Sequence, residues 1–180
     1  MKDYEVWKNN FNDEEEDIFE VENKLYALRY IIEEIYCQDA YCDCYTFVED
    51  VKYLYQQLSD NELRELKEHN RNMLKDYISY NKDGSESVEI YRGYINTSVN
   101  YNLAVSFTPL KDYAEQFAIL RSDDYREDGY IIYGKISIDD IIWTYQQNNN
   151  ESLTELIVKP HSFIPMEEYL YRKFDNWIIS

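Results

Sequence analysis

The sequence predicts an α+β fold in one compact domain, with a helical N-terminal region over residues 1–82 and a β-rich core over residues 83–180. All 4 glycines and all 3 prolines follow residue 83, so no strong helix breaker interrupts the first region. Runs rich in isoleucine, valine and aromatic residues begin only after the segment NKDGSES at 81–87. A helical block that precedes several such runs indicates α+β rather than a repeating βαβ sheet.

Apolar residues of the N-terminal region recur at intervals of three and four, the spacing of one helix face. The first stripe covers residues 18–35, and the acidic segment 14–17 stands where a helix dipole favours negative charge. A second stripe covers residues 48–58. The segment SDNE at 59–62 predicts a capping box for a third helix. That helix is expected to carry Leu63, Leu66, Met73 and Tyr77. We interpret all three stripes as core packing.

The second half of the chain contains five runs that predict β-strands. They cover residues 88–94, 103–108, 129–138, 140–145 and 154–160. Between the second and third runs, the segment PLKDYAEQFAIL predicts one helix, with Pro109 in its first turn. Its expected apolar face consists of Tyr113, Phe117 and Leu120.

The formal net charge of −18 limits the classes of partner. Such a chain repels the phosphate backbone, so direct nucleic-acid binding is not expected, whereas a protein with a basic surface is compatible with it. No run has the length of a membrane span, and the first ten residues lack the apolar region of a signal peptide. These features indicate a cytoplasmic protein, or one delivered to or made in a host cell.

The three cysteines, Cys37, Cys42 and Cys44, lie within eight residues. The two histidines are distant from them and match no zinc-ligand spacing, so we expect reduced cysteines and no metal. The sequence also lacks G-x-G-x-x-G and the P-loop motif, which argues against a Rossmann dehydrogenase or a P-loop enzyme.

Four short motifs of the second half occur in a fixed order. They are YRG at 91–93, SFT at 106–108, AEQFA at 114–118 and TELIV at 154–158. In this order they resemble the R-S-E class of mono-ADP-ribosyltransferases. That class has an aromatic-Arg-Gly strand, a Ser-x-Ser/Thr strand followed by an A-x-x-F-A helix, and a catalytic glutamate that opens a late strand. The resemblance covers roughly residues 88–170 and implies a split, mixed or antiparallel sheet core behind a helical region.

The resemblance implies transfer of ADP-ribose from NAD, as a substrate, to a protein acceptor, with release of nicotinamide, by a toxin, effector or phage-encoded factor. Arg92 is expected to hold the phosphate side of NAD, and Gly93 to let the backbone approach the nicotinamide. Glu155 is expected to stabilise positive charge on the ribose, and Ser106 to hydrogen-bond Glu155 or the nicotinamide ribose. The expected NAD site is completed by Phe107, Thr108 and Tyr91, with Tyr94 or Tyr101 as further aromatic candidates.

Two features depart from this family pattern. Leu153 stands two residues before Glu155, where many arginine-modifying members carry glutamine or glutamate. Either Glu151 assists Glu155 or is itself the catalytic carboxylate, or the acceptor is not arginine. The interval between Arg92 and Ser106 is short, which implies an abbreviated loop on the adenine side.

The sequence is also compatible with two other functions. An NAD glycohydrolase would use the same residues, with water in place of the protein acceptor. Alternatively, the charge of −18 and acidic runs such as NDEEED are compatible with a non-enzymatic inhibitor that mimics nucleic acid on a transferase-like scaffold.

Overall fold

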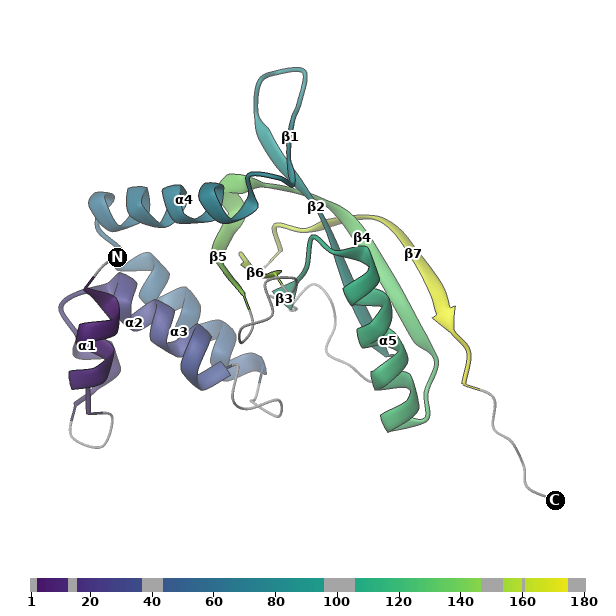
Figure 1. The fold of residues 1–180 in the computed structure, drawn as a ribbon, viewed down its shortest axis with the longest axis horizontal. Coiled ribbons are helices and arrows are strands. Elements are labelled where there is room, and N and C mark those ends of the chain that lie inside the picture. Colours follow the sequence, from purple (N-terminus) through teal and green to yellow (C-terminus); the bar gives the residue numbers. More distant parts are fainter. Residues whose placement is uncertain are drawn as a thin grey trace. The chain divides into compact units, whose positions relative to one another are not determined.

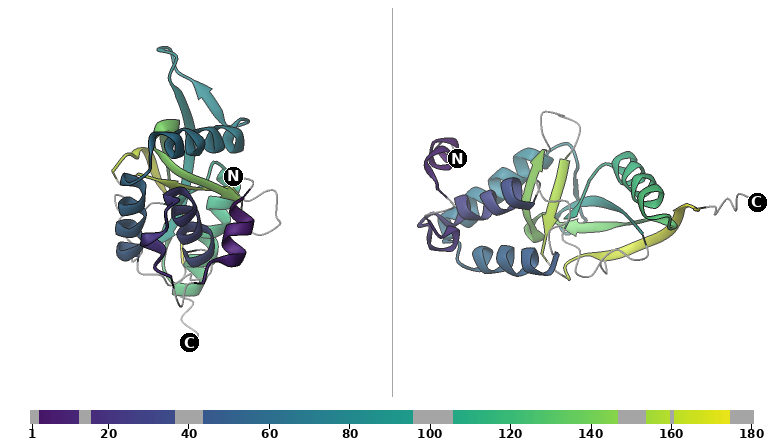
Figure 2. Two further views of the ribbon diagram at one scale, coloured as in Figure 1. Left: turned by 90° about the vertical axis from the view of Figure 1, so that its left-hand side faces the viewer. Right: turned by 90° about the horizontal axis from the view of Figure 1, so that it is seen from below.

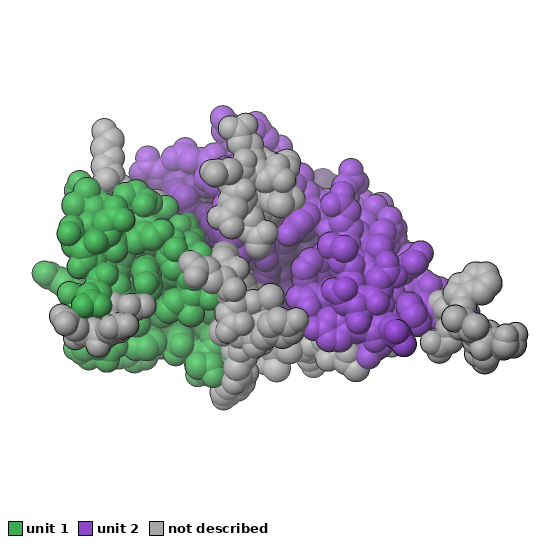
Figure 3. Space-filling model, turned by 60° about the horizontal axis from the view of Figure 1, so that its bottom comes forward, with its two compact units in different colours: residues 1–66 green, residues 67–180 purple. Residues whose placement is uncertain are grey.

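The computed structural model describes residues 3–12, 16–36, 44–95, 106–146, 154–159 and 161–174. It consists of N-terminal helices followed by antiparallel sheets, which confirms the predicted α+β class (Figure 1). The chain forms two compact units, Met1–Leu66 and Lys67–Ser180 (Figure 3). The division falls within helix α4 (Asp60–Leu74), so the region 1–82 contributes to both units.

The first unit contains α1 (Tyr4–Asn10), α2 (Lys24–Tyr30) with a π-helical continuation Ile31–Tyr36, and α3 (Cys44–Gln56). Its aromatic side chains cluster where α1 meets α2. The Trp7 ring lies 5.1 Å from Phe11, 5.6 Å from Tyr26 and 6.0 Å from Tyr30, between ring centroids. The buried apolar residues of α2 and α3 include Leu25, Leu28, Val48 and Val51 of the predicted stripes, together with Ala27, Phe47 and Leu54. Ile35, at the end of the first stripe, is 46% exposed, contrary to the expectation of core packing.

The start of the first long helix was predicted wrongly. Residues 18–20 form a short 3-10 turn, because the Asp17 side chain accepts from the Phe19 amide at 2.9 Å. The α-helix begins only after Asn23, whose side chain accepts from the Tyr26 amide at 3.0 Å. Local side-chain caps therefore outweigh the apolar spacing in setting this boundary.

The capping box of α4 is confirmed. The Ser59 amide donates to Glu62 Oε2 at 2.8 Å, and the Glu62 amide donates to Ser59 Oγ at 3.4 Å. The helix ends at Leu74, so Tyr77 lies beyond it, contrary to expectation. Among the residues described above, no helix is long and apolar enough to cross a membrane.

The second unit contains two antiparallel sheets. The larger has the order β1-β2-β4-β7, formed by Ile78–Tyr80, Glu86–Ile95, Gly129–Ser137 and Ile164–Arg172. The smaller has the order β3-β6-β5, formed by Ser106–Phe107, Thr154–Val158 and Ile141–Gln146. Each of the five predicted runs contains a strand, although residues 138 and 140 belong to a 3-10 turn and residues 108 and 159 lie beyond their strands. Residues 103–105 and 160 lie outside the described part of the chain. Strands β1 and β7 were not predicted.

The main core of this unit lies between the two sheets. It joins Leu74 of α4 to apolar side chains of both sheets and to Ile138 and Phe163, which lie just outside the strands. The strand residues are Val88, Ile90, Phe107, Ile132, Ile136, Ile141, Leu156 and Val158. A bridge between Tyr91 and Thr108 connects the sheets, with N–O distances of 2.7 and 2.9 Å.

Helix α5 (Lys111–Tyr125) covers the other face of the larger sheet (Figures 1 and 2). Its fully buried residues are Ala114, Ala118 and Ser122. The predicted apolar face is wrong at Leu120, which is 62% exposed, whereas Tyr113 and Phe117 are half-buried. Pro109 also precedes the N-cap residue Leu110 instead of occupying the first turn. Small residues face the sheet because the backbone of the helix lies very close to it.

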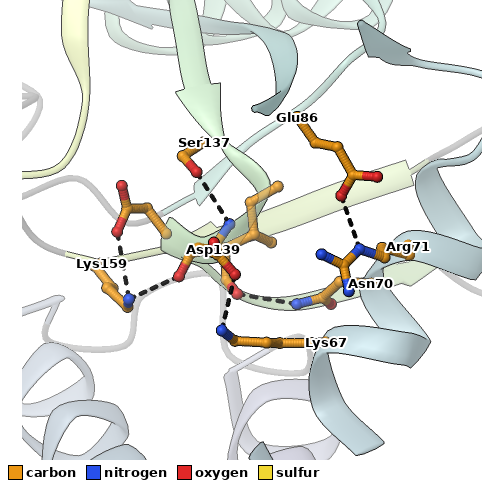
Figure 4. Close-up of polar contacts among 9 residues, drawn as sticks. Lys67, Asn70, Arg71, Glu86, Ser137, Asp139 and Lys159 are labelled. Carbon is orange, nitrogen blue, oxygen red and sulfur yellow. Dashed lines mark hydrogen bonds and ion pairs between the residues drawn. The ribbon is translucent and has the colours of Figure 1, made fainter. Parts of the chain in front are cut away.

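Polar contacts attach the C-terminal half of α4 to β2, to β5 and to the 3-10 turn Ile138–Asp140 of the second unit (Figure 4). Lys67 Nζ lies 2.8 Å from Asp139 Oδ1, and Arg71 Nε lies 2.8 Å from Glu86 Oε2. The fully buried Asn70 donates its side-chain amide to the Ile141 carbonyl at 2.9 Å. These contacts orient the end of the helix whose Leu74 enters the core.

Removal of the Lys67 ammonium should produce a small, pH-dependent loss of stability. The hydrogen bond from Lys67 lowers the pKa of Asp139. A carboxylate whose folded-state pKa is lowered stabilises the fold above its unfolded pKa of about 4, and this contribution disappears as pH falls through the folded-state pKa. Because the pair is largely exposed, Lys67→Met should cost at most ~1 kcal/mol at pH 7. Urea unfolding at pH 7 and pH 3 measures this, with Lys75→Met as the control for net charge.

Candidate active site

Three residues singled out by the sequence, Arg92, Ser106 and Glu155, lie in one chain of hydrogen bonds. Arg92 Nη1 donates to the Ser106 carbonyl at 2.7 Å, and the Ser106 hydroxyl donates to Glu155 Oε1. The expected bond between Ser106 and Glu155 is therefore present. The three residues come from strands β2, β3 and β6, separated by many residues in sequence.

Strand register explains why these side chains meet. Phe107 pairs with Leu156, and both enter the core, so their neighbours Ser106 and Glu155 project from the opposite face of the smaller sheet. Arg92 lies on the same face of β2 as the core residue Ile90, two positions earlier. The bridge between β2 and β3 then brings the guanidinium to the Ser106 carbonyl.

A fourth residue, Tyr145, completes the surroundings of Glu155. It is the direct partner of Glu155 in the β5–β6 register, and its hydroxyl donates to Glu155 Oε2 at 2.6 Å. The ring is buried, with 4% of the residue exposed. Sequence reasoning missed Tyr145, because the contact depends on how strands 141–146 and 154–158 pair. The only sequence feature that pointed to Tyr145 was its position in the run 140–145, which predicted a strand.

The other two residues of the SFT motif have structural contacts. The Phe107 ring is 2% exposed and lies 4.5 Å from the Phe163 ring, between centroids, within the core. Thr108 pairs with Tyr91 through its backbone, and its Oγ1 accepts from the Leu110 amide at 3.1 Å. Phe107 thus anchors the strand and Thr108 helps to start α5, so neither side chain is placed as an exposed contact for NAD.

Tyr91 lies on the opposite face of β2 from Arg92, because successive strand residues alternate. Its ring stacks on Tyr133 at 5.6 Å, and its hydroxyl donates to Glu89. Burial, together with the bond to Glu89, raises the pKa of Tyr91. The structure therefore separates the Tyr91 ring from the guanidinium.

Tyr94 is the described aromatic candidate that shares the Arg92 face of β2. Its ring stacks on Tyr130 at 5.6 Å, and its hydroxyl donates to Glu168 of β7. Tyr94 therefore shares the strand face of Arg92, which Tyr91 does not.

Gly93 has a packing role that the motif does not reveal. A Cβ atom added there would lie 2.1 Å from the Ala114 carbonyl oxygen and 2.7 Å from the Ala118 amide nitrogen. Both obstructing atoms belong to the backbone of α5. The close approach of helix and sheet therefore requires glycine at this position.

Several predicted features lie outside the described residues. They are Glu151, Leu153, Tyr101, Cys37 and Cys42. Cys44 is the first residue of α3. In the part of the chain that the structure describes, no group of three or more His, Cys, Asp or Glu residues is arranged to hold a metal ion.

Comparison of the chain with protein-family models, curated proteins and solved structures found no significant match. The relationship to the R-S-E class therefore stays a prediction from the sequence motifs.

Proposed function

We propose that this chain is an NAD-dependent mono-ADP-ribosyltransferase, with Glu155 as the catalytic carboxylate. The observation that carries the proposal is the hydrogen bond between Ser106 and Glu155 beside Arg92. The order of the sequence motifs selects these three residues, which come from strands distant in the chain. If the motif matches were accidental, there would be no reason for the three residues to lie in contact. If Arg92 only formed a surface ion pair, or if Ser106 only marked the start of a helix, this arrangement would not be required.

The chemistry of the side chains suits NAD as a substrate. A guanidinium is a planar, permanently charged donor that matches phosphate oxygens, and in a chain with a net charge of −18 such a local cation favours the binding of an anion. A carboxylate can accept the ribose 2′-hydroxyl and stabilise positive charge that develops on the sugar ring. Arg92 and Glu155 supply these two groups.

The proposed reaction breaks the bond between the ribose C1′ and the nicotinamide nitrogen. The electron pair of that bond leaves with nicotinamide, which becomes neutral. A nucleophilic atom of the protein acceptor bonds to C1′, and its proton passes to solvent or to a nearby base. Glu155 contributes by favouring the charge-separated transition state over the bound substrate.

NAD glycohydrolysis is the second candidate, and Leu153 is the observation that favours it. An apolar residue stands where many arginine-modifying members of the class carry an acceptor-positioning side chain. Water could then serve as the nucleophile at the same site, and free ADP-ribose would be the product.

Labelled NAD separates these candidates in one experiment. The protein is incubated with NAD labelled in the adenylate phosphate and with a candidate host lysate, and both nicotinamide release and protein labelling are followed. Release with labelled protein supports the transferase, and release with free ADP-ribose alone supports the glycohydrolase. Absence of release, together with no NAD binding by calorimetry, contradicts both and favours a non-enzymatic acidic binding protein.

Arg92→Ala should weaken NAD binding, raising KM for nicotinamide release by about 30-fold or more, as expected for the loss of charged hydrogen bonds. The matched control is Arg121→Ala, which makes the same change in net charge on α5, where Arg121 lies over the Phe117 ring. Equal KM values for the two variants would show that Arg92 serves only to hold the Ser106 carbonyl.

A further inference from the structure

We propose that Tyr145 is a positioning residue that holds the carboxylate of Glu155 in its reactive orientation. This inference rests on the proposed function and extends it to a residue outside the R, S and E motifs. Tyr145 donates to Glu155 Oε2 at 2.6 Å, while Ser106 donates to Oε1. Each carboxylate oxygen therefore receives a hydroxyl donor from a different neighbouring strand of the smaller sheet.

The two donors together restrict the terminal side-chain torsion of Glu155, which has no strong rotamer preference of its own. The terminal torsion of a glutamate side chain is broad, so a carboxylate held at one oxygen can still rotate. Donors on both sides, from β3 and from β5, fix the plane of the group. A carboxylate can accept about four hydrogen bonds, so two protein donors orient it without preventing a bond from a ribose hydroxyl.

Tyr145 is suited to this role because it is buried and paired with Glu155. Its residue is 4% exposed and lies directly opposite Glu155 in the strand pairing. Directly paired residues of antiparallel strands place their Cβ atoms about 4.5–5.5 Å apart, so the phenol reaches the carboxylate without a change in either backbone. The position of the Tyr145 donor relative to Glu155 is thus set by the pairing of β5 with β6.

Replacement of Tyr145 by phenylalanine removes one oxygen atom and retains the ring. Since Glu155 acts on the transition state, Tyr145→Phe should lower kcat for nicotinamide release about tenfold and change KM for NAD by less than about twofold. Tyr133→Phe is the matched control: it removes a phenol–carboxylate bond of 3.2 Å to Glu167 and should leave kcat unchanged. An unchanged kcat in Tyr145→Phe, or a rise in KM alone, would overturn the positioning role.

If Tyr145→Phe also lowers thermal stability, a double-mutant cycle with Glu155→Asp separates the effect on Glu155 from the effect on stability. The shorter aspartate withdraws the carboxylate from Tyr145, so the phenylalanine substitution should then change kcat by less than about twofold. An equal tenfold loss in both backgrounds would show that Tyr145 acts on stability and not through Glu155.

The same data distinguish failure of this inference from failure of the proposed function. If wild-type protein releases nicotinamide and Glu155→Gln does not, but Tyr145→Phe has wild-type kinetics, only the inference is wrong. If the wild-type protein releases no nicotinamide, the proposed function and the inference fall together.

Discussion

Glu155→Gln should abolish nicotinamide release, with kcat at least about 10³-fold lower than in the wild-type protein. The substitution keeps the size of the side chain and removes its charge. The remaining oxygen can still accept from Tyr145, and the new amide group can donate to Ser106 Oγ, because a hydroxyl both donates and accepts. Loss of activity would therefore report the missing negative charge and not a displaced strand.

Two measurements support the interpretation of Glu155→Gln. Thermal unfolding should differ little from wild type, since both contacts to the side chain persist. Affinity for NAD by calorimetry should fall only slightly, because the charge acts mainly in the transition state. Full turnover in this variant would contradict the assignment and leave Glu151 as the carboxylate to test next.

The order of elements was predictable because it depends on local patterns. Apolar runs marked the strands that the structure confirms, and the SDNE motif marked the start of α4. Strand β7 was missed because Pro165 lies within it and many of its side chains are exposed, features that argue against an interior strand. Strand β7 lies at the edge of the larger sheet, where proline and exposed side chains are both compatible with a strand.

The site was predictable only in part, because motif order does not determine which side chains share a face. Arg92, Ser106 and Glu155 were found from their motifs, and they meet. Strand alternation alone separates Tyr91 from Arg92, so this consequence could have been drawn from the sequence. Tyr145 could not be found in that way, since its contact with Glu155 depends on the register of β5 against β6.

Gly93→Ala should destabilise the second unit by about 3 kcal/mol or more, although it adds only one methyl group. The new Cβ would lie 2.1 Å from the Ala114 carbonyl oxygen, far inside van der Waals contact. Relief requires α5 to move away from the sheet, which disrupts the packing of Ala118 and Ile131. Urea unfolding, together with amide hydrogen exchange in β2 and β4, measures this loss.

Two control variants separate this packing effect from a role of Gly93 in substrate binding. Gly84→Ala places a methyl group where nothing lies within 4 Å, and only its positive φ of +84° opposes the change, so it should cost about 1 kcal/mol. Adding Ala118→Gly to Gly93→Ala should restore little stability, because the nearest obstructing atoms belong to the backbone. Equal stability of Gly93→Ala and wild type, with NAD turnover lost, would instead show that Gly93 is required for approach of the substrate and not for the seating of α5.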